Sequence, residues 1–182
     1  MGTHKALCRL CEGSDMTFIQ QLESVTRGLT PHRAIVSSLA ASELAVDLPV
    51  VIQPRPEEGQ LSSLLLGWDH FAAGIERVMV CLVDHPYVKR STLVDLAAES
   101  EAFPNFLMWS PSYKRRGGHP VIFSKEMMER LRSSPLSEGA RPVVRSLGDQ
   151  RRWLDCDDEA ILWDVDTPER YLECKRLYSL RG

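Results

Sequence analysis

A carboxylate, an imidazole and a proline follow a continuous apolar run in the middle of the chain. The segment 80–86 reads Val-Cys-Leu-Val-Asp-His-Pro. In open α/β sheets the carboxyl ends of strands face the ligand crevice, so Asp84 could hold a metal ion or a phosphate-linked group there. Alternatively, Asp84 caps the turn before Pro86, as aspartate often does. Spacing alone leaves both interpretations open.

A second acidic cluster lies near the C-terminus, where residues 161–168 read Ile-Leu-Trp-Asp-Val-Asp-Thr-Pro. We expect an apolar strand that ends here, directly before a helix. Residues two apart in a strand face the same side, so Asp164 and Asp166 could reach one site. The alternative is that Asp166 or Thr167 only starts the helix.

A basic, glycine-containing segment spans residues 113–123 and reads Tyr-Lys-Arg-Arg-Gly-Gly-His-Pro-Val-Ile-Phe. Its cations and glycines could hold an anionic ligand through side chains and backbone amides together, ahead of a short strand. It could equally be a solvated loop in which His119 only bonds within the fold. Lys5 is a further candidate. So are Ser62 and Ser63, although Ser62 could simply cap a helix.

These residues need a scaffold, and the hydrophobic pattern predicts one. Runs 48–52 and 77–83 lack polar alternation, as strands buried on both faces of a parallel sheet do. Runs 33–36 and 106–109 are weaker strand candidates. Helical spacing occurs at 18–28, 62–73, 91–100, 125–133 and 168–180. Strands and helices therefore alternate, which indicates an α/β fold.

The flanks of two predicted helices carry clear boundary signals. The proline-rich segment 53–59 predicts a loop before the helix that contains Ser62. Thr167 is a good cap for the last helix, with Pro168 at its first position. The apolar side of that last helix is expected to consist of Tyr171, Leu172, Leu177 and Leu180.

Composition limits the class of protein. A chain of 182 residues suits one domain. Its hydrophobic fraction of 43% and charged fraction of 26% are typical of soluble globular proteins. A net charge of -3 provides no positive field for a nucleic-acid partner. No apolar run approaches the roughly 20 residues that span a bilayer, so no membrane association is expected.

Cysteine usage indicates a reducing compartment. The chain has 5 cysteines, an odd and scattered set unlike a secreted disulfide framework, which favours the cytoplasm. Cys8 and Cys11 form a C-x-x-C pair that could bind zinc or cycle as a dithiol. No second half-site follows at zinc-finger spacing.

The motifs, taken in order, resemble those of the MobA-like NTP transferase family, most closely its molybdenum cofactor cytidylyltransferase branch. The family pattern has Arg-Met-Gly-x-x-Lys, an Asn-containing loop before Gly-x-x-x-Ser, Asp-Gln-Pro or Asp-Met-Pro, Gly-His-Pro, Gly-Ala-Arg and Asp-Ile-Asp-Thr-Pro. The resemblance covers nearly the whole chain. The matching segments here are Met1-Gly2-Thr3-His4-Lys5, residues 53–59 with Ser62-Ser63, Asp84-His85-Pro86, Gly118-His119-Pro120, Gly139-Ala140-Arg141 and Asp164-Val165-Asp166-Thr167-Pro168.

The resemblance implies a Rossmann-like nucleotidyltransferase fold, a three-layer α/β/α sandwich with a mostly parallel sheet, as one domain over residues 1–182. The family's first strand and glycine-rich loop have no counterpart before Met1. We therefore expect an N-terminally truncated domain with two unpaired strand edges, one on the strand that precedes Asp84. Either the true start lies upstream, or the chain is a decayed homologue.

The resemblance also implies an activity: transfer of a nucleoside monophosphate from an NTP, CTP by the closest branch, to the phosphate of a molybdopterin-type acceptor, with release of pyrophosphate. It makes Asp84 the catalytic Mg²⁺ ligand and Asp166 a second ligand, and hard Mg²⁺ prefers such carboxylate oxygens. Lys5 would steady the triphosphate. Ser62 and Ser63 would lie near the nucleotide, and Gly118, His119 and Pro120 on the acceptor side.

Two other functions remain open on the sequence. One is a non-catalytic protein that binds a molybdenum cofactor or inserts it into a partner molybdenum hydroxylase. The other keeps nucleotidyl transfer but changes the acceptor to a sugar phosphate or another phosphorylated compound. Besides the missing strand and loop there are smaller departures from the family pattern: Gln53 replaces Asn, His85 replaces Gln or Met, and Arg170 replaces an acidic residue.

Overall fold

Strands and helices alternate along the chain, which confirms the predicted α/β class. The computed structural model describes residues 4–71 and 74–180. In chain order the elements are η1 (Lys5–Leu7), α1 (Phe18–Thr26), β1 (Ile35–Ser37), α2 (Ala41–Leu44), β2 (Val50–Ile52), η2 (Pro56–Glu58), α3 (Gly59–His70), β3 (Arg77–Val80), α4 (Arg90–Ala102), β4 (Met108–Tyr113), β5 (Arg116–Gly117), β6 (Val121–Ser124), α5 (Lys125–Arg132), η3 (Leu136–Glu138), α6 (Arg141–Arg145), η4 (Gly148–Gln150), β7 (Arg151–Asp155), η5 (Glu159–Leu162) and α7 (Pro168–Ser179).

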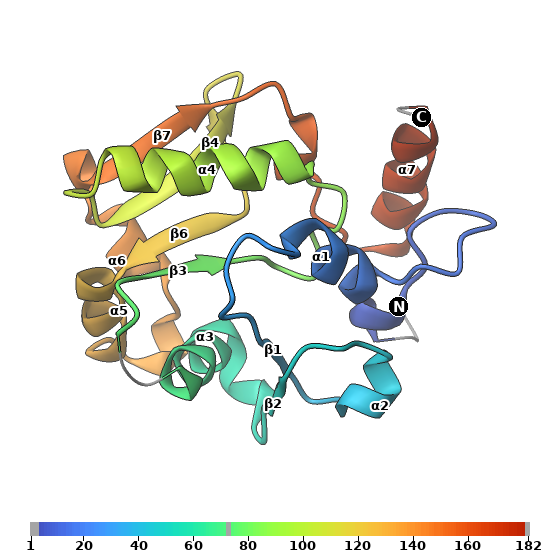
Figure 1. Ribbon diagram of the computed structural model, residues 1–182, viewed down its shortest axis with the longest axis horizontal. Coiled ribbons are helices and arrows are strands. Elements are labelled where there is room, and N and C mark those ends of the chain that lie inside the picture. The colour runs from blue at the N-terminus through green and yellow to red at the C-terminus, as the bar shows by residue number, and fades with distance from the viewer. Residues whose placement is uncertain (1–3, 72–73, 181–182) are drawn as a thin grey trace.

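The main sheet has the order β3-β6-β4, with β5 and β7 both paired to β4. β6 is antiparallel to β3 and to β4, and β7 is parallel to β4. The chain between β4 and β6 is too short for the crossover that a parallel neighbour needs, so β6 returns antiparallel. Consequently β3, β4 and β7 share one direction, and their carboxyl ends meet at one edge of the sheet (Figure 1).

A second, two-stranded parallel sheet is made by β1 and β2, with Val36 opposite Val51. Among the described residues, β1 pairs only with β2 and β3 pairs only with β6. The family resemblance predicts an unpaired edge on the strand before Asp84, and β3 has one within this part of the chain. The Met1-Gly2-Thr3 portion of the predicted motif lies outside the described residues.

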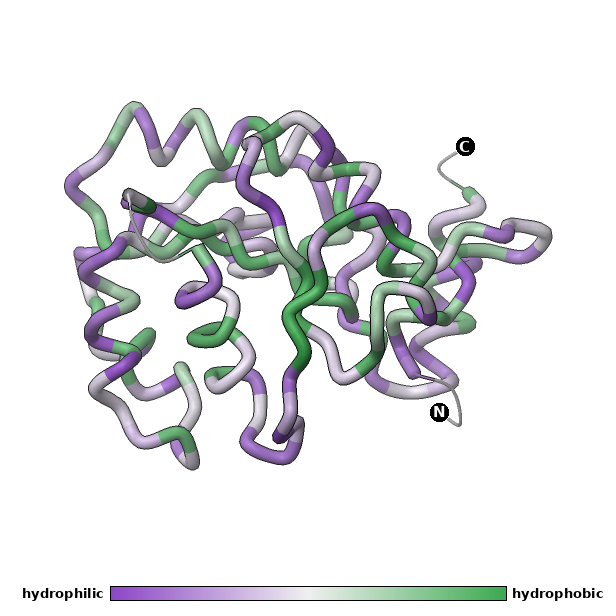
Figure 2. Tube along the Cα trace, turned by 60° about the horizontal axis from the view of Figure 1, so that its bottom comes forward, coloured by the Kyte–Doolittle hydropathy of each residue, from purple (hydrophilic) through white to green (hydrophobic). Residues whose placement is uncertain are grey.

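Helices cover both faces of the main sheet and give the predicted three layers. On one face, Val78 and Val80 of β3 and Phe123 of β6 pack against α3 and α5. On the other face, Met79 and Ile122 pack with Leu96 of α4. Successive residues of β3 therefore face opposite sides of the sheet, as the two-residue period of a strand requires. Figure 2 shows hydrophobic stretches through the middle of the trace.

Two strand predictions were wrong in detail. β3 ends at Val80, opposite Val121 of β6, because the preceding Pro120 has no N–H to extend the ladder. Residues 161–163 are not a strand, since η5 (Glu159–Leu162) begins where the Asp158 side chain accepts from the Ala160 amide. The strand β7 (Arg151–Asp155) was missed, because its charged residues conceal the two-residue pattern.

The helix boundaries largely follow the predicted signals. Thr167 caps α7 by accepting from the Arg170 amide, as predicted. α3 begins at Gly59, so Ser62 lies inside its first turns and is not a cap; the predicted end of this helix, residues 72–73, lies outside the described part. The predicted apolar side of α7 was half wrong, since Leu172 and Leu180 are exposed while Cys174 is buried.

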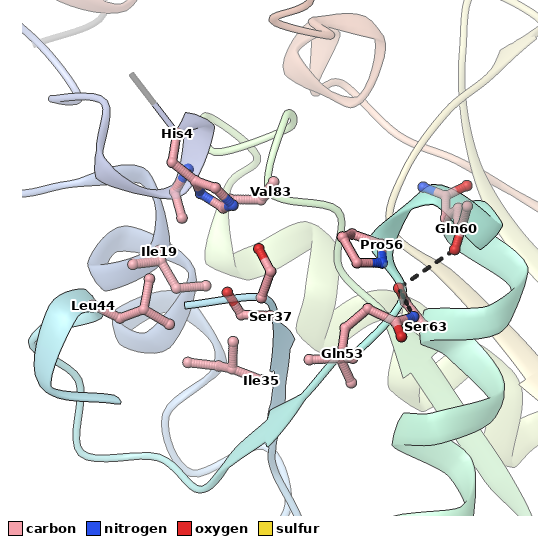
Figure 3. Close-up of a pocket in the computed structure, with 14 residues that line it drawn as sticks. His4, Ile19, Ile35, Ser37, Leu44, Gln53, Pro56, Gln60, Ser63 and Val83 are labelled. Carbon is pink, nitrogen blue, oxygen red and sulfur yellow. Dashed lines mark hydrogen bonds between the residues drawn. The ribbon is translucent and has the colours of Figure 1, made fainter. Parts of the chain in front are cut away.

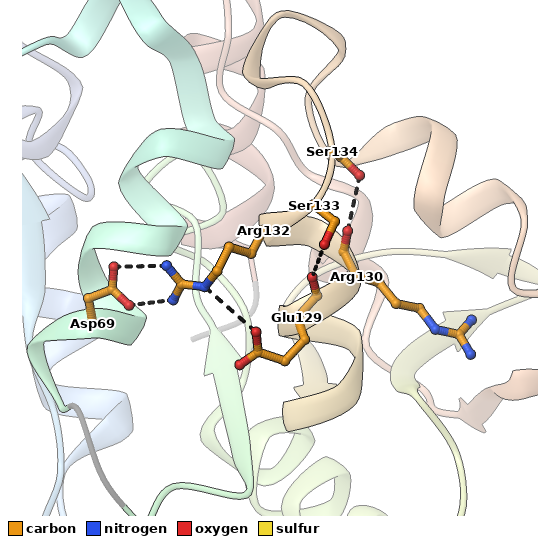
Figure 4. Close-up of polar contacts among 6 residues, drawn as sticks. All are labelled: Asp69, Glu129, Arg130, Arg132, Ser133 and Ser134. Atoms are coloured by element: carbon orange, nitrogen blue, oxygen red, sulfur yellow. Dashed lines mark hydrogen bonds and ion pairs between the residues drawn. The ribbon is translucent and has the colours of Figure 1, made fainter.

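An arginine at the end of α5 joins it to α3. Arg132 donates two hydrogen bonds to the Asp69 carboxylate and lies 3.8 Å from Glu129 (Figure 4). Exposed pairs of this kind contribute little, about 0–1 kcal/mol. Packing of the apolar residues beneath them therefore holds this layer on the sheet.

No helix among residues 4–71 and 74–180 has the length and apolar character needed to cross a bilayer.

A pair of matched leucine substitutions tests this packing. Leu131 in α5 is 0% exposed and Leu172 in α7 is 66% exposed. We expect Leu131→Ala to lower the free energy of unfolding by about 2–5 kcal/mol, because it leaves a cavity in the core. Leu172→Ala should change it by no more than about 0.5 kcal/mol. Urea unfolding followed by circular dichroism measures both, and equal effects would contradict the assignment of the core.

Candidate active site

Asp84 lies in a turn beyond the carboxyl end of β3, at the shared edge of the main sheet. The His85 amide donates to the Leu82 carbonyl at 3.1 Å and closes the turn. The Asp84 carbonyl accepts from the Val165 amide at 2.9 Å. One carboxylate oxygen, Oδ2, lies 3.9 Å from Lys5 Nζ. The other, Oδ1, is buried and has no hydrogen-bond partner among the described residues.

Lys5 joins Asp84 to the second acidic cluster. Its ammonium donates to Asp166 Oδ1 at 2.5 Å while facing Asp84. This hydrogen bond lowers the pKa of the Asp166 carboxyl from its ordinary value. The carboxylates of Asp84 and Asp166 therefore converge on one cation.

The acidic segment reaches Asp84 because its apolar residues are buried next to it. Trp163 and Val165 are buried, whereas Asp164 and Asp166 are exposed. The predicted alternation is thus present although the segment is not a paired strand. The amide of Val165 supplies the bond to the Asp84 carbonyl, which fixes the register of the two carboxylates.

The N-terminal segment is fixed by the same apolar cluster. Cys8 and Phe18 pack with Trp163, Val165 and Cys174. The hydroxyl groups of two tyrosines also bond the N-terminal backbone, since Tyr87 donates to the Leu10 carbonyl and Tyr171 to the Arg9 carbonyl. Figure 1 shows η1 and α7 on the same side of the molecule. Residues from both ends of the chain thereby build one site.

His119 lies beside His85, with ring centroids 5.0 Å apart. The His119 amide donates to the Ile161 carbonyl at 3.0 Å. Gly118 is required at the preceding position, because a Cβ there would lie 2.2 Å from the Ile161 oxygen. Burial lowers the pKa of both imidazoles, that of His119 to about 4, helped by His85 and Arg151. The His119 ring is therefore neutral at pH 7.

The basic segment that contains His119 is divided by the fold. Lys114 and Arg115 form the exposed turn of a β4–β5 hairpin with positive φ angles of 49° and 65°. These cations point into solvent, which agrees with the alternative of a solvated loop. The Gly118-His119-Pro120 portion instead packs next to His85.

A cavity of about 310 Å³ is lined by residues of η1, α1, β1 and α3 and by the segment after β3. Its lining includes Ser37 at the end of β1, Gln53 after β2, Ser63 in α3 and Val83 next to Asp84 (Figure 3). Gln53 Nε2 donates to Ser63 Oγ at 3.0 Å and to Ser62 Oγ at 3.2 Å. Ser63 therefore faces the cavity, whereas Ser62 is buried behind it and donates to Glu58.

Three of the predicted site residues, Lys5, Asp84 and Asp166, come together directly. The Gly118–Pro120 segment joins them through His85, and Ser63 lies across the cavity. Cys8 and Cys11 are free thiols. Arg151 was not predicted as a site residue. Its local sequence carries no signal for one, because the residues around it come from other parts of the chain.

The donor set suits a hard divalent cation. Within the described residues no three His, Cys, Asp or Glu side chains gather as a metal site. Mg²⁺ is commonly held by one or two carboxylates together with substrate phosphates and water. Asp84, with its buried unpartnered oxygen, and Asp166 match that pattern, and the ammonium of Lys5 already shows that the position between them attracts positive charge.

The fold and this edge define a class: an α/β protein with a candidate ligand site beyond the carboxyl ends of its strands. Residues 1–152 match the MobA-like NTP transferase domain, and the chain belongs to that family. It is accordingly a nucleotidyltransferase by class. No curated protein matches the sequence.

Several solved structures share the fold. Rv0371c from Mycobacterium tuberculosis is 23% identical, with a TM-score of 0.77 over 97% of this chain and 90% of that chain. The same protein in complex with manganese gives 20% identity, a TM-score of 0.74, and coverage of 96% and 94%. Molybdopterin-guanine dinucleotide biosynthesis protein A from Archaeoglobus fulgidus is 15% identical, with a TM-score of 0.70 over 98% of this chain and 92% of that chain.

A more distant fold relative is CMP:2-keto-3-deoxy-manno-octonic acid synthetase, solved with CTP. It is 10% identical, with a TM-score of 0.69 over 91% of this chain and 89% of that chain. Identities this low establish the common fold, and with it the Rossmann-like nucleotidyltransferase architecture that the motifs predicted.

The Gly118 contact gives a first test of the site. Gly118→Ala places a methyl group against the Ile161 backbone, so either η5 or the His119 loop must shift. We expect a loss of about 1–3 kcal/mol in the free energy of unfolding, as for other overpacked positions. Thermal unfolding of the variant measures it. An unchanged melting temperature would contradict the contact.

The neutral state of His119 gives a second test. Its native pKa of about 4 lies below the unfolded value of about 6.5. Between these values the unfolded chain binds the proton that the native protein does not, so this group lowers stability as pH falls. Titration of the imidazole resonances by NMR should give a midpoint well below the ordinary value. A midpoint near about 6.5 would contradict the burial described here.

Proposed function

We propose that the protein transfers a nucleoside monophosphate, CMP from CTP, to the phosphate of a molybdopterin-type acceptor and releases pyrophosphate. The observation that carries this proposal is the convergence of Asp84 and Asp166 on Lys5 at the carboxyl edge of the sheet. Phosphoryl-type transfer chiefly needs positioning and neutralisation of charge, and this cluster supplies both.

Asp84 and Asp166 are the proposed ligands of Mg²⁺. When bound, the metal neutralises negative charge on the phosphates and orients them for in-line displacement. Lys5 then pairs with the triphosphate in place of the carboxylates. An oxygen of the acceptor phosphate attacks the α-phosphorus, the bond to the β-phosphate oxygen breaks, and pyrophosphate leaves with that oxygen. No protein nucleophile is needed.

The two substrates are proposed to approach from different sides. The cavity beside Val83 and Ser63 is the nucleotide side, where the Ser63 hydroxyl offers a polar contact and Ser62 holds Gln53 and Glu58 in place. Gly118, His119 and Pro120 form the acceptor side. His85 lies between the two, next to both Asp84 and His119.

The choice of substrates draws on the names of proteins with the same fold. One is a molybdopterin-guanine dinucleotide biosynthesis protein, which supports a pterin acceptor. Another was solved with CTP, which supports cytidylyl transfer. The manganese complex of Rv0371c supports a divalent metal. A cytoplasmic location and a molybdenum hydroxylase as the final recipient of the cofactor complete the proposal.

Substitution of the principal carboxylate tests the proposal. We expect Asp84→Asn to keep the fold and to reduce pyrophosphate release by at least about a hundredfold, since the metal contributes several kcal/mol of charge stabilisation. Asp95→Asn, on the exposed side of α4, is the matched control and should leave the rate unchanged. Near-normal activity of Asp84→Asn would exclude Asp84 as the principal ligand.

Calorimetry with Mg-CTP and Mg-GTP separates the remaining functions. Preference for CTP supports cytidylyl transfer, while clear preference for GTP would replace it with guanylyl transfer. Binding of a pterin phosphate without any binding of Mg-nucleotide would instead favour a cofactor-carrying protein.

A further inference from the structure

Arg151, the first residue of β7, is half-buried and carries a charge that no carboxylate balances. Its Nη2 donates to Ser110 Oγ at 2.9 Å, and its guanidinium stacks on the Trp153 ring at 3.7 Å. Its Nε is buried without a hydrogen-bond partner, and none of the ion pairs among the described residues includes it. An arginine remains protonated even when burial lowers its pKa. A desolvated, unpaired cation of this kind is costly.

The neighbouring arginine shows how the fold treats a charge that has only a structural role. Arg152 pairs with Glu99 at 2.7 Å and lies over Phe103 at 3.9 Å. Because successive side chains of a strand point to opposite faces, Arg152 faces α4 while Arg151 faces the other side. The protein therefore compensates one of two adjacent arginines and leaves the other without an anion.

The position of Arg151 is prepared by glycine. A Cβ on Gly117 would lie 2.3 Å from the Trp153 ring and 3.4 Å from Nη2 of Arg151. Only glycine leaves room for the stacked pair there. Gly117 is followed in the chain by Gly118 and His119. Ser110, which Arg151 bonds, lies two residues along β4 from Met108, the register partner of Arg151. The guanidinium thus extends toward the carboxyl edge of the sheet.

Several buried polar side-chain atoms have no hydrogen-bond partner. Among the described residues there are four: Asp84 Oδ1, His85 Nδ1, His119 Nδ1 and Arg151 Nε. We call these four residues the polar row. His85 lies 3.9 Å from Asp84 and 5.0 Å from the His119 ring, and the charge of Arg151 acts on His119. Buried polar groups are normally hydrogen-bonded. Unpartnered polar atoms on neighbouring side chains therefore indicate a ligand.

We propose that Arg151, together with His119, forms an oxyanion subsite that binds a phosphate monoester group, which the proposed function identifies as that of the acceptor. The guanidinium can donate two hydrogen bonds from Nε and an Nη to one phosphate, a geometry that lysine lacks. The neutral imidazole adds a donor without adding charge. Asp84 closes the opposite end of the polar row, so the subsite holds the acceptor phosphate on the side away from the nucleotide cavity.

The test is a titration of the ¹⁵N-labelled protein with phenyl phosphate in the absence of nucleotide and metal, followed by the backbone amide resonances of Gly118 and His119, which every variant retains. Wild type should show saturable binding. Arg151→Gln should weaken it by at least about tenfold, the usual effect of a hydrogen bond to a charged group. Arg151→Lys should be intermediate. Arg116→Gln, an exposed cation on β5, is the control and should bind like wild type.

A second variant and thermal unfolding separate binding from folding. Gly117→Ala keeps Arg151 but displaces Trp153, on which the guanidinium stacks. It should therefore also weaken the binding of phenyl phosphate. Melting temperatures of all variants are compared without ligand. If Arg151→Gln does not fold, Arg151→Lys and Gly117→Ala carry the test, and phenyl phosphate binding equal to wild type in both would overturn the proposal.

Further arms distinguish the source of the phosphate. A parallel titration with pyrophosphate stands for the phosphates of the nucleotide. The proposal is overturned if wild type shows no saturable binding of phenyl phosphate, if Arg151→Gln binds phenyl phosphate as wild type does, or if Arg151→Gln weakens the binding of pyrophosphate alone. Affinity for Mg-CTP should be unchanged in Arg151→Gln. Arg151-dependent phenyl phosphate binding without any Mg-nucleotide binding would support the subsite and remove the proposed nucleotidyl transfer.

Discussion

The hydrogen bond from the Val165 amide to the Asp84 carbonyl determines the arrangement of the candidate site. It joins two segments far apart in sequence at the carboxyl edge of the sheet. With Val165 buried, Asp166 must emerge on the side of Asp84, and the two carboxylates would repel each other without a cation. Lys5 supplies that charge in the ligand-free protein. The same electrostatic requirement is what a divalent metal would satisfy.

The short helix η5 extends this arrangement toward the acceptor side. Its Ile161 carbonyl accepts from the His119 amide and lies where only glycine fits at position 118. The loop between β5 and β6 is therefore tied to the segment that leads to Asp166. This bond joins the proposed acceptor side to the segment that carries Asp166.

Much of the fold could be predicted because local rules and burial agree in it. Thr167 capped α7 as expected, and the apolar run before Asp84 formed a strand. β7 was missed because Arg151 and Arg152 are adjacent and hide the alternation of a strand, and their partners, Ser110 and Glu99, lie in other elements. Residues 161–163 were misread as a strand because apolar sequence alone cannot distinguish a buried strand from a buried helical turn.

The candidate site, too, could be predicted from sequence only in part. Asp84 and Asp166 could be proposed from sequence because each follows a valine that packs in the core and each matches a motif of the family. The role of Lys5 could be inferred only from the order of the motifs, and Arg151 only from its surroundings in space. Residues whose function depends on long-range contacts leave no periodic trace in the chain.

The central claim is that Asp84 and Asp166 share one divalent cation with a nucleotide. A crystal grown with Mn²⁺ and a non-hydrolysable CTP analogue tests it most directly, through the anomalous scattering of manganese. We predict one strong peak between the two carboxylates, in contact with the phosphates, with Lys5 turned from Asp166 toward the triphosphate. A nucleotide bound with its manganese away from both aspartates would contradict the account.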